Sequence, residues 1–164
     1  MKTTISPQQR AFLDMIAVSE GTSTSPATKN DGYDVIVTGV DGKPEVFTDY
    51  SCHPFSTGRP PKRINNRGLS SSASGRYQHM RVHWPHYKLM LGLPDFGPAS
   101  QDRWALQLIR ERGALPDIEA GRFDAAVAKC SNIWASLPGA GYGQPEHSLA
   151  VLERAFVKAG GKLA

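Results

Sequence analysis

The feature that most constrains the fold is an amphipathic helix predicted close to the start of the chain. Ser6 suits the N-cap, Pro7 suits the first helical position, and Gln9 has the spacing that completes a capping box. Apolar residues then recur at three- and four-residue spacing, which places them on one helical face. These residues are Leu13, Ile16 and Ala17. The chain is therefore expected to open with a helix that has one apolar face.

An acid, Glu20, continues this apolar face at the C-terminal end of the predicted helix, and Gly21 is suited to end it. A carboxylate there is disfavoured by about 0.3–1 kcal/mol, because the C-terminus of a helix carries partial negative charge. Desolvation by apolar neighbours disfavours the ionised form again. We therefore expect a raised pKa, which suits a general acid near neutral pH. Spacing alone does not exclude the alternative that Glu20 is a structural acid that extends into solvent and pairs with Lys or Arg.

The rest of the chain predicts a small hairpin and then several helices. The segments "YDVIVTG" and "EVFTDY" flank an Asp-Gly turn signal, so a β-hairpin is expected over about 34–50. Residues 53–75, rich in Pro, Gly, Ser and Arg, are expected to form an irregular basic loop. Helices are expected in "RYQHMRVHW", stopped near Pro85, in "ASQDRWALQLIRERG", capped by Ser100, in "DIEAGRFDAAVAKCSNIWASL" and in "SLAVLERAFVKAGG". This order predicts an α+β fold in one domain spanning residues 1–164.

Composition narrows the partners only slightly. Lys and Arg exceed Asp and Glu by 19 to 15, a formal charge of +4, which suits nucleic acid, a phospholipid surface or a cell-wall glycan equally. The first residues lack the apolar core of a signal peptide, and no stretch approaches the roughly 20 apolar residues of a membrane span. We expect a protein made soluble in the cytoplasm that needs a partner for export. Cys52 and Cys130 form no CxxC pair and are expected to be free, buried thiols.

Several blocks of the sequence occur in an order that resembles a known family. These blocks are "AFLDMIAVSEGT", "GYDVIV", "FTDYSCHP", "SASGRYQ", "LPDFGPASQD", "RERGALP" and "CSNIWASLPGAGYGQ". Together they make the chain similar, over nearly its whole length, to the bacteriophage lambda endolysin family of lysozyme-like lytic transglycosylases. The resemblance implies a lysozyme-like fold with a hairpin lobe beside a saccharide cleft, no cofactor, and Glu20 as the acid/base.

The resemblance also implies substrate-binding residues. The "SGRYQ" block is expected to line the cleft, with Gln78 in the place of a glutamine of the transglycosylase motif and Tyr77 beside it. Tyr142, in "GAGYGQ", is expected on the opposite wall. Asp34 and Asp49 are further candidates, because the hairpin follows the predicted catalytic helix closely. Each has a structural alternative: Asp34 ordering the start of the hairpin, and Asp49 capping a turn.

The number of carboxylates separates two reactions on peptidoglycan. A hydrolytic muramidase needs a second carboxylate as nucleophile or base. A lytic transglycosylase needs only one, because the 6-hydroxyl of the muramic acid attacks C1 within the same sugar and gives a 1,6-anhydro product. Spacing leaves both open, and the resemblance favours transglycosylation. It further implies a monomer that binds glycan strands and not nucleic acid, and a membrane-permeabilising, holin-type partner that releases it to the cell wall.

Two other classes compete with this interpretation. A non-catalytic basic module would bind wall polymer or nucleic acid through a loop that contains Arg59, Lys62, Arg63 and Arg67. A zinc peptidase would use His79 and His83, four residues apart on a predicted helix. No glutamate lies between them as in an HExxH motif, so no metal is expected. The tryptophans, expected in the core, are Trp84, Trp104 and Trp134.

Overall fold

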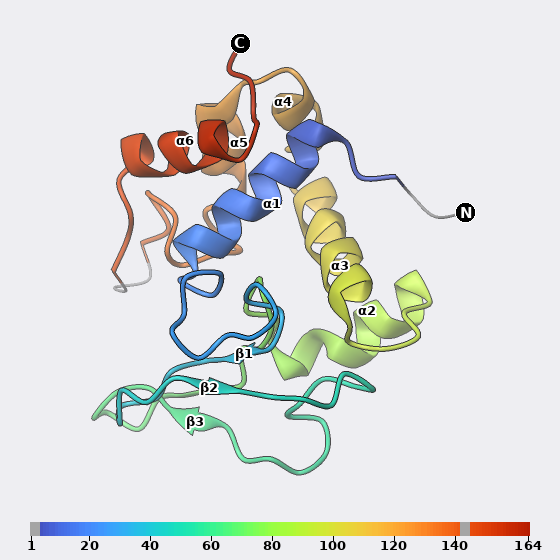
Figure 1. Cartoon of the computed structure of the whole chain (residues 1–164), viewed down its shortest axis with the longest axis vertical. Coiled ribbons are helices and arrows are strands. Elements are labelled where there is room, and N and C mark those ends of the chain that lie inside the picture. The colour runs from blue at the N-terminus through green and yellow to red at the C-terminus, as the bar shows by residue number, and fades with distance from the viewer. Residues whose placement is uncertain (1–3, 142–144) are drawn as a thin grey trace. The chain divides into compact units, whose positions relative to one another are not determined.

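The computed structural model describes residues 4–141 and 145–164, and its first helix, α1 (Pro7–Ser19), has the boundaries that the capping box predicts (Figure 1). The Ser6 hydroxyl accepts the Gln9 N–H at 3.1 Å, and the Gln9 side chain accepts the Ser6 N–H at 3.3 Å. Gly21 follows the helix with a φ of 72°, a conformation that glycine adopts without strain. The apolar face predicted for this helix is fully buried, which confirms the interpretation of the stripe.

The chain divides into two compact units. The helical unit comprises Met1–Glu20 and Ala105–Ala164, and the hairpin unit comprises Gly21–Trp104. Helix α3 (Pro98–Glu111) begins in the hairpin unit and ends in the helical unit. One domain over residues 1–164 stays a prediction, whereas the mixed α+β composition is confirmed. None of the described helices is both long and apolar enough to span a bilayer.

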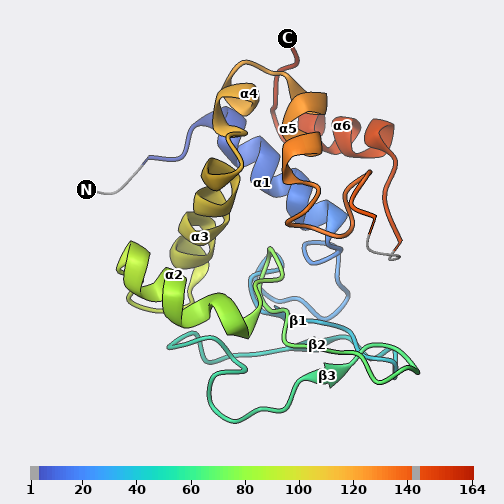
Figure 2. The ribbon, with the colours of Figure 1, turned by 180° about the vertical axis from the view of Figure 1, so that it is seen from behind.

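The helical unit is built around α1. Its other helices are α4 (Leu115–Glu119), α5 (Phe123–Cys130) and α6 (Leu149–Lys158). Helix α1 packs against α4 and α6, and α4 packs against α5 (Figures 1 and 2). Phe12, Phe123 and Phe156 form the aromatic centre of this packing, with ring centroids 5.1 to 6.5 Å apart. Burial of these large rings supplies much of the apolar area that stabilises the unit.

The hairpin unit contains two short antiparallel hairpins. Its strands are β1 (Val35–Ile36), β2 (Glu45–Val46), β3 (Lys62–Arg63) and β4 (Ser70–Ser71). Val35 pairs with Val46 in the first hairpin, so the hairpin expected over 34–50 is confirmed. Lys62 pairs with Ser71 in the second, so the expectation of an irregular loop over 53–75 is wrong where β3 and β4 pair.

Polar contacts explain why the second hairpin forms without apolar alternation. The Asn65 side chain accepts the N–H groups of Arg67 and Leu69 at 2.9 and 3.0 Å, which closes the turn. Glu45, on β2, binds Lys62 at 2.8 Å and Arg59 at 3.0 Å. The basic residues are therefore partly held by an acid on the first hairpin, a contact that local patterns do not reveal.

The helix predicted over residues 76–84 is also wrong. A 3₁₀ turn, η1 (Arg81–His83), precedes α2 (Trp84–Leu91). Before it, Ser74 and His79 pair in an antiparallel bridge that closes a turn. Pro85 lies in the first turn of α2, where its missing N–H costs no hydrogen bond, so it starts a helix where it was expected to stop one. Ser100 lies inside α3, where its hydroxyl donates to Asp95 at 2.9 Å, and does not cap the helix as expected.

Candidate active site

Glu20 lies at the end of α1, and its carboxyl is hydrogen-bonded to the hydroxyl of Ser136. Its N–H donates to the Ile16 carbonyl at 2.8 Å, as the last helical hydrogen bond requires. Its Oε1 accepts a hydrogen bond from Ser136 Oγ at 2.8 Å. Ser136 Oγ in turn lies 2.7 Å from Ser19 Oγ. Glu20, Ser19 and Ser136 all belong to the helical unit, so this geometry is complete within one unit.

The environment of Glu20 makes it a proton donor near neutral pH. Although part of the residue remains exposed, burial raises the pKa of its carboxyl from 4.5 to about 7, and the Ser136 hydrogen bond opposes this rise. A group with this pKa both donates and accepts a proton at neutral pH. The raised pKa expected from the sequence is confirmed, whereas the catalytic role of Glu20 stays a prediction.

Two residues expected at the substrate lie in the interior of the hairpin unit. Asp34 is 4% exposed, and its carboxylate accepts hydrogen bonds from Thr28 Oγ1 at 2.5 Å and the Lys29 N–H at 2.9 Å. Tyr77 is 0% exposed, and its hydroxyl donates to Asp102 at 2.5 Å. These contacts correct the expectation that both side chains face substrate. Asp34 has the structural role considered as its alternative, because it orders the start of the hairpin.

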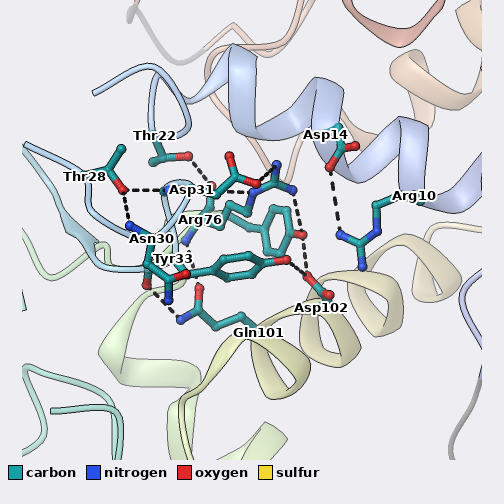
Figure 3. Close-up of polar contacts among 12 residues, drawn as sticks. Arg10, Asp14, Thr22, Thr28, Asn30, Asp31, Tyr33, Arg76, Gln101 and Asp102 are labelled. Atoms are coloured by element: carbon teal, nitrogen blue, oxygen red, sulfur yellow. Dashed lines mark hydrogen bonds and ion pairs between the residues drawn. The ribbon is translucent and has the colours of Figure 1, made fainter. Parts of the chain in front are cut away.

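A polar network surrounds the buried Arg76 (Figure 3), and Tyr77 belongs to it through hydrogen bonds with Arg76 and Asp102. The Arg76 guanidinium lies 5.2 Å from the Tyr33 ring centroid and 5.7 Å from that of Tyr77. Its Nε donates to the Asp31 carbonyl at 2.9 Å, and its Nη2 lies 3.3 Å from the Asp31 carboxylate. Asp102 accepts hydrogen bonds from both tyrosines. The network fixes the "SGRYQ" turn, which carries Gln78, inside the hairpin unit.

Gln78 and Asp49 remain accessible in the hairpin unit. Gln78 has a φ of 53°, unusual for a residue with a side chain, and its Nε2 donates to the Gly75 carbonyl at 3.0 Å. Asp49 is exposed and accepts the Ser51 N–H at 2.9 Å, the turn contact considered as its alternative. Hydrogen bonds from Ser51 lower the pKa of Asp49. Contact of either residue with substrate stays a prediction, and Tyr142 lies outside the described residues.

The histidine spacing does not form a helical metal site. His79 precedes η1, and its ring packs flat on Trp104 while Nε2 lies 3.2 Å from the Gln101 carbonyl. His83 ends η1 on the exposed side. Among residues 4–141 and 145–164, no three His, Cys, Asp or Glu side chains are grouped so as to hold a metal ion. The i, i+4 helical spacing on which a zinc peptidase depends is therefore not formed.

The two cysteines are free, as expected, and lie in different units. Cys130 is buried, and burial raises the pKa of its thiol to about 12. Cys52 is only half-buried, which corrects the expectation that both thiols are buried. The predicted core positions of Trp84, Trp104 and Trp134 are confirmed.

Ser136 is the site residue that the sequence pattern did not reveal. It lies 116 positions from Glu20. A serine in a loop has no periodicity or spacing that points to a distant acid. The block "CSNIWASLPGAGYGQ", which carries part of the family resemblance, contains Ser136 and gave the only available signal.

Comparison with known proteins places this geometry in a family. Residues 10–163 match the family model described as Endolysin. The endolysin of Escherichia phage P2 is 68% identical over 151 residues, which cover 92% of this chain and 92% of that protein. The endolysin of Escherichia phage lambda is 52% identical over 158 residues, which cover 96% of this chain and 94% of that protein.

Solved structures agree with the sequence matches. A structure of bacteriophage lambda lysozyme in complex with a chitohexasaccharide aligns with a TM-score of 0.89 at 51% identity, over 99% of both chains. A further structure of lysozyme from bacteriophage lambda aligns with a TM-score of 0.84 at 50% identity, again over 99% of both chains. The α+β fold is therefore lysozyme-like. Matched in sequence and in fold over nearly its whole length, the chain belongs to the Endolysin family.

Proposed function

We propose that this endolysin-family enzyme is a peptidoglycan lytic transglycosylase that lyses the host cell. It cleaves the β-1,4 bond between N-acetylmuramic acid and N-acetylglucosamine and leaves a 1,6-anhydromuramic product, with Glu20 as the acid/base. The observation that carries the proposal is the raised pKa of the Glu20 carboxyl. With a pKa of about 7, this group can both donate and accept a proton at neutral pH. The bound chitohexasaccharide of the related lambda lysozyme supports a β-linked amino-sugar polymer as substrate.

The reaction uses the Glu20 carboxyl twice, first as an acid and then as a base. The protonated carboxyl donates to the glycosidic oxygen as the bond from that oxygen to C1 of the muramic acid breaks. The resulting carboxylate then accepts the proton of the 6-hydroxyl of the same sugar as that oxygen bonds to C1. No water is consumed, and Glu20 returns to its protonated state. Because nucleophile and electrophile belong to one sugar ring, their effective molarity is high.

The contacts of Asp34 favour this reaction over hydrolysis. A hydrolase needs a second carboxylate that is free to act as nucleophile or base. Asp34, one of the two candidates from the sequence, is buried and already accepts hydrogen bonds from Thr28 and Lys29. Asp49, the other, accepts the Ser51 N–H in a turn. A hydrolytic muramidase acting on the same bond is the alternative.

Export and assembly are further parts of the proposal. The enzyme is made in the host cytoplasm, acts as a monomer without a cofactor, and reaches the wall when a holin-type protein permeabilises the inner membrane. Family membership supports this route. The formal charge of +4 suits an anionic wall polymer.

The first experiment replaces the proposed acid. Glu20→Gln keeps the size and hydrogen-bonding capacity of the side chain but not its proton, so lysis of permeabilised cells should fall at least 100-fold while the circular dichroism spectrum is unchanged. Glu153→Gln, on α6 of the same unit, is the matched control and should lyse normally. Lysis by Glu20→Gln at the wild-type rate would rule out the assigned role. A non-catalytic wall-binding module, the competing class, predicts binding without loss of turbidity.

The second experiment separates the two reactions. Mass spectrometry of muropeptides released by the wild-type enzyme should show products one water lighter than the hydrolytic ones and without reducing ends. Products with reducing ends would identify a hydrolase and overturn transglycosylation.

A further inference from the structure

We propose that Ser136 is a positioning residue for the reaction, held by a clasp of Ser19, Glu146 and His147, and that it fixes one carboxyl oxygen of Glu20. The inference rests on the proposed function of Glu20 and deepens it. No pattern in the sequence assigns a role to any of these four residues, whereas the structure brings them together at the end of α1.

The hydroxyl groups form a relay whose direction follows from the carboxylate. An ionised carboxylate only accepts hydrogen bonds, so Ser136 Oγ donates to Glu20 Oε1 across 2.8 Å. The Ser136 oxygen is then free to accept, and Ser19 Oγ, 2.7 Å away, donates to it. Ser19 is 3% exposed, so its hydroxyl has little access to solvent. Two serines therefore orient one oxygen of the acid.

His147 ties this relay to the end of α1. Its backbone N–H donates to the Ser136 carbonyl at 2.9 Å, and its Nε2 lies 2.9 Å from the Ser19 carbonyl. Because a carbonyl only accepts, Nε2 carries the proton and donates. The Ser19 carbonyl belongs to the last turn of α1, where carbonyl groups lack helical partners. Ser19 and Ser136 are thus joined twice, directly through their hydroxyls and indirectly through His147.

Glu146 fixes the turn that follows Ser136. Its Oε1 accepts the Gly139 N–H at 2.9 Å, and its Oε2 accepts the Gly141 N–H at 3.2 Å. Both glycines have positive φ values, 83° and 74°, so their amides converge on one anion in the way of a backbone nest. Glu146 adjoins His147 in the chain. The neighbouring residues 146 and 147 therefore anchor both the turn and the Ser136 backbone.

The clasp has a chemical consequence for Glu20. A hydrogen bond donated to the ionised form lowers the pKa of a carboxyl, and that from Ser136 opposes the effect of burial. Burial raises the pKa of Glu20 and this bond lowers it, while the His147 ring faces the Ser19 carbonyl. Removing the hydroxyl therefore raises the pKa of Glu20 further and leaves its carboxyl free to rotate. The first effect alters the pH dependence, and the second lowers the rate.

The test compares Ser136→Ala with Ser136→Thr and Ser131→Ala. Ser131 is the matched control, because its hydroxyl donates to the Ala128 carbonyl, at 2.9 Å, in the same unit and not to Glu20. In Ser136→Ala, kcat should fall roughly 10- to 100-fold with little change in KM. The alkaline limb of kcat/KM, where Glu20 loses its proton, should move up by roughly one pH unit. Ser136→Thr, which keeps a hydroxyl, should restore the wild-type limb, and Ser131→Ala should match the wild type.

A ¹³C NMR titration of the Glu20 carboxyl gives a readout that does not depend on activity. The midpoint should rise in Ser136→Ala and, by less, in Ser19→Ala, which removes only the second donor. Such a rise supports the clasp whatever the activity of Glu20→Gln. Lysis by Glu20→Gln would overturn the proposed function and leave the clasp standing. An unchanged midpoint in both variants, or the same kinetic loss in Ser131→Ala, overturns the inference.

Discussion

The imidazole of His79 lies flat against the indole of Trp104, with ring centroids 4.0 Å apart and ring planes within 4° of parallel. His53 lies next to this pair, and its Nε2 is 2.8 Å from the His79 carbonyl. Burial lowers the pKa of His79 to about 3 and that of His53 to about 4. Both rings are therefore neutral core groups of the hairpin unit at neutral pH.

The first prediction is a loss of stability in acid. The folded pKa of each histidine lies below its unfolded value of 6.5, so the unfolded chain binds more protons as the pH falls from 6.5 towards 4. Each ring should reduce the free energy of unfolding by up to about 1.4 kcal/mol per pH unit. Urea unfolding at several pH values in this window measures the slope. Replacement of the exposed His86 by Gln should leave that slope unchanged, whereas a flat wild-type profile would contradict the assignment.

Glu20 carries a second prediction of opposite sign. Its folded pKa of about 7 exceeds the ordinary 4.5, so its stabilising contribution is present below pH 4.5 and is lost as the pH rises through 7. Glu20→Gln imitates the neutral form. At pH 8 it should be more stable than the wild type by about 1–3 kcal/mol, a range lowered to allow for partial exposure. The difference in urea midpoints should vanish near pH 4, and a variant less stable than the wild type at pH 8 would refute the linkage.

The buried cation of the hairpin unit gives the third prediction. Arg76 is 3% exposed and bonds Asp31. Arg76→Ala should lower the free energy of unfolding by about 3–5 kcal/mol, because it removes one partner of a buried polar network. Arg67→Ala, at an exposed position of the β3–β4 turn, should change it by less than about 0.5 kcal/mol. Equal losses in the two variants would show that the network does not stabilise the unit.

A pair of glycines provides the fourth prediction. Gly75 and Gly58 both have positive φ values, 81° and 92°, so a side chain at either position meets backbone strain. Only at Gly75 would a Cβ also approach a neighbour, the Gln101 Oε1, within 2.3 Å. Gly75→Ala should therefore lower the thermal unfolding midpoint clearly more than Gly58→Ala. Similar midpoints would mean that the Gln101 side chain moves away from the new Cβ without loss of stability.

Local signals in the sequence predicted the elements whose determinants are local. The boundaries of α1 follow from Ser6, Pro7 and Gln9, all within one turn of the helix start. The raised pKa of Glu20 was expected from the same apolar stripe, and burial is its largest cause.

Features set by distant contacts escaped prediction. The second hairpin depends on Glu45, and the burial of Tyr77 depends on Asp102, each supplied by another element. Asp34 was misassigned because the local sequence does not distinguish a buried structural aspartate from one that binds substrate. Ser136 was missed because its bond to Glu20 spans most of the chain.

The measurement that tests the central claim most directly is the ¹³C NMR titration of the Glu20 carboxyl in the wild-type protein, assigned by the signal that disappears in Glu20→Gln. The account predicts a midpoint near 7, the value produced by burial against the Ser136 hydrogen bond. A midpoint at the ordinary value of 4.5 would leave Glu20 ionised at neutral pH and would contradict its role as the acid.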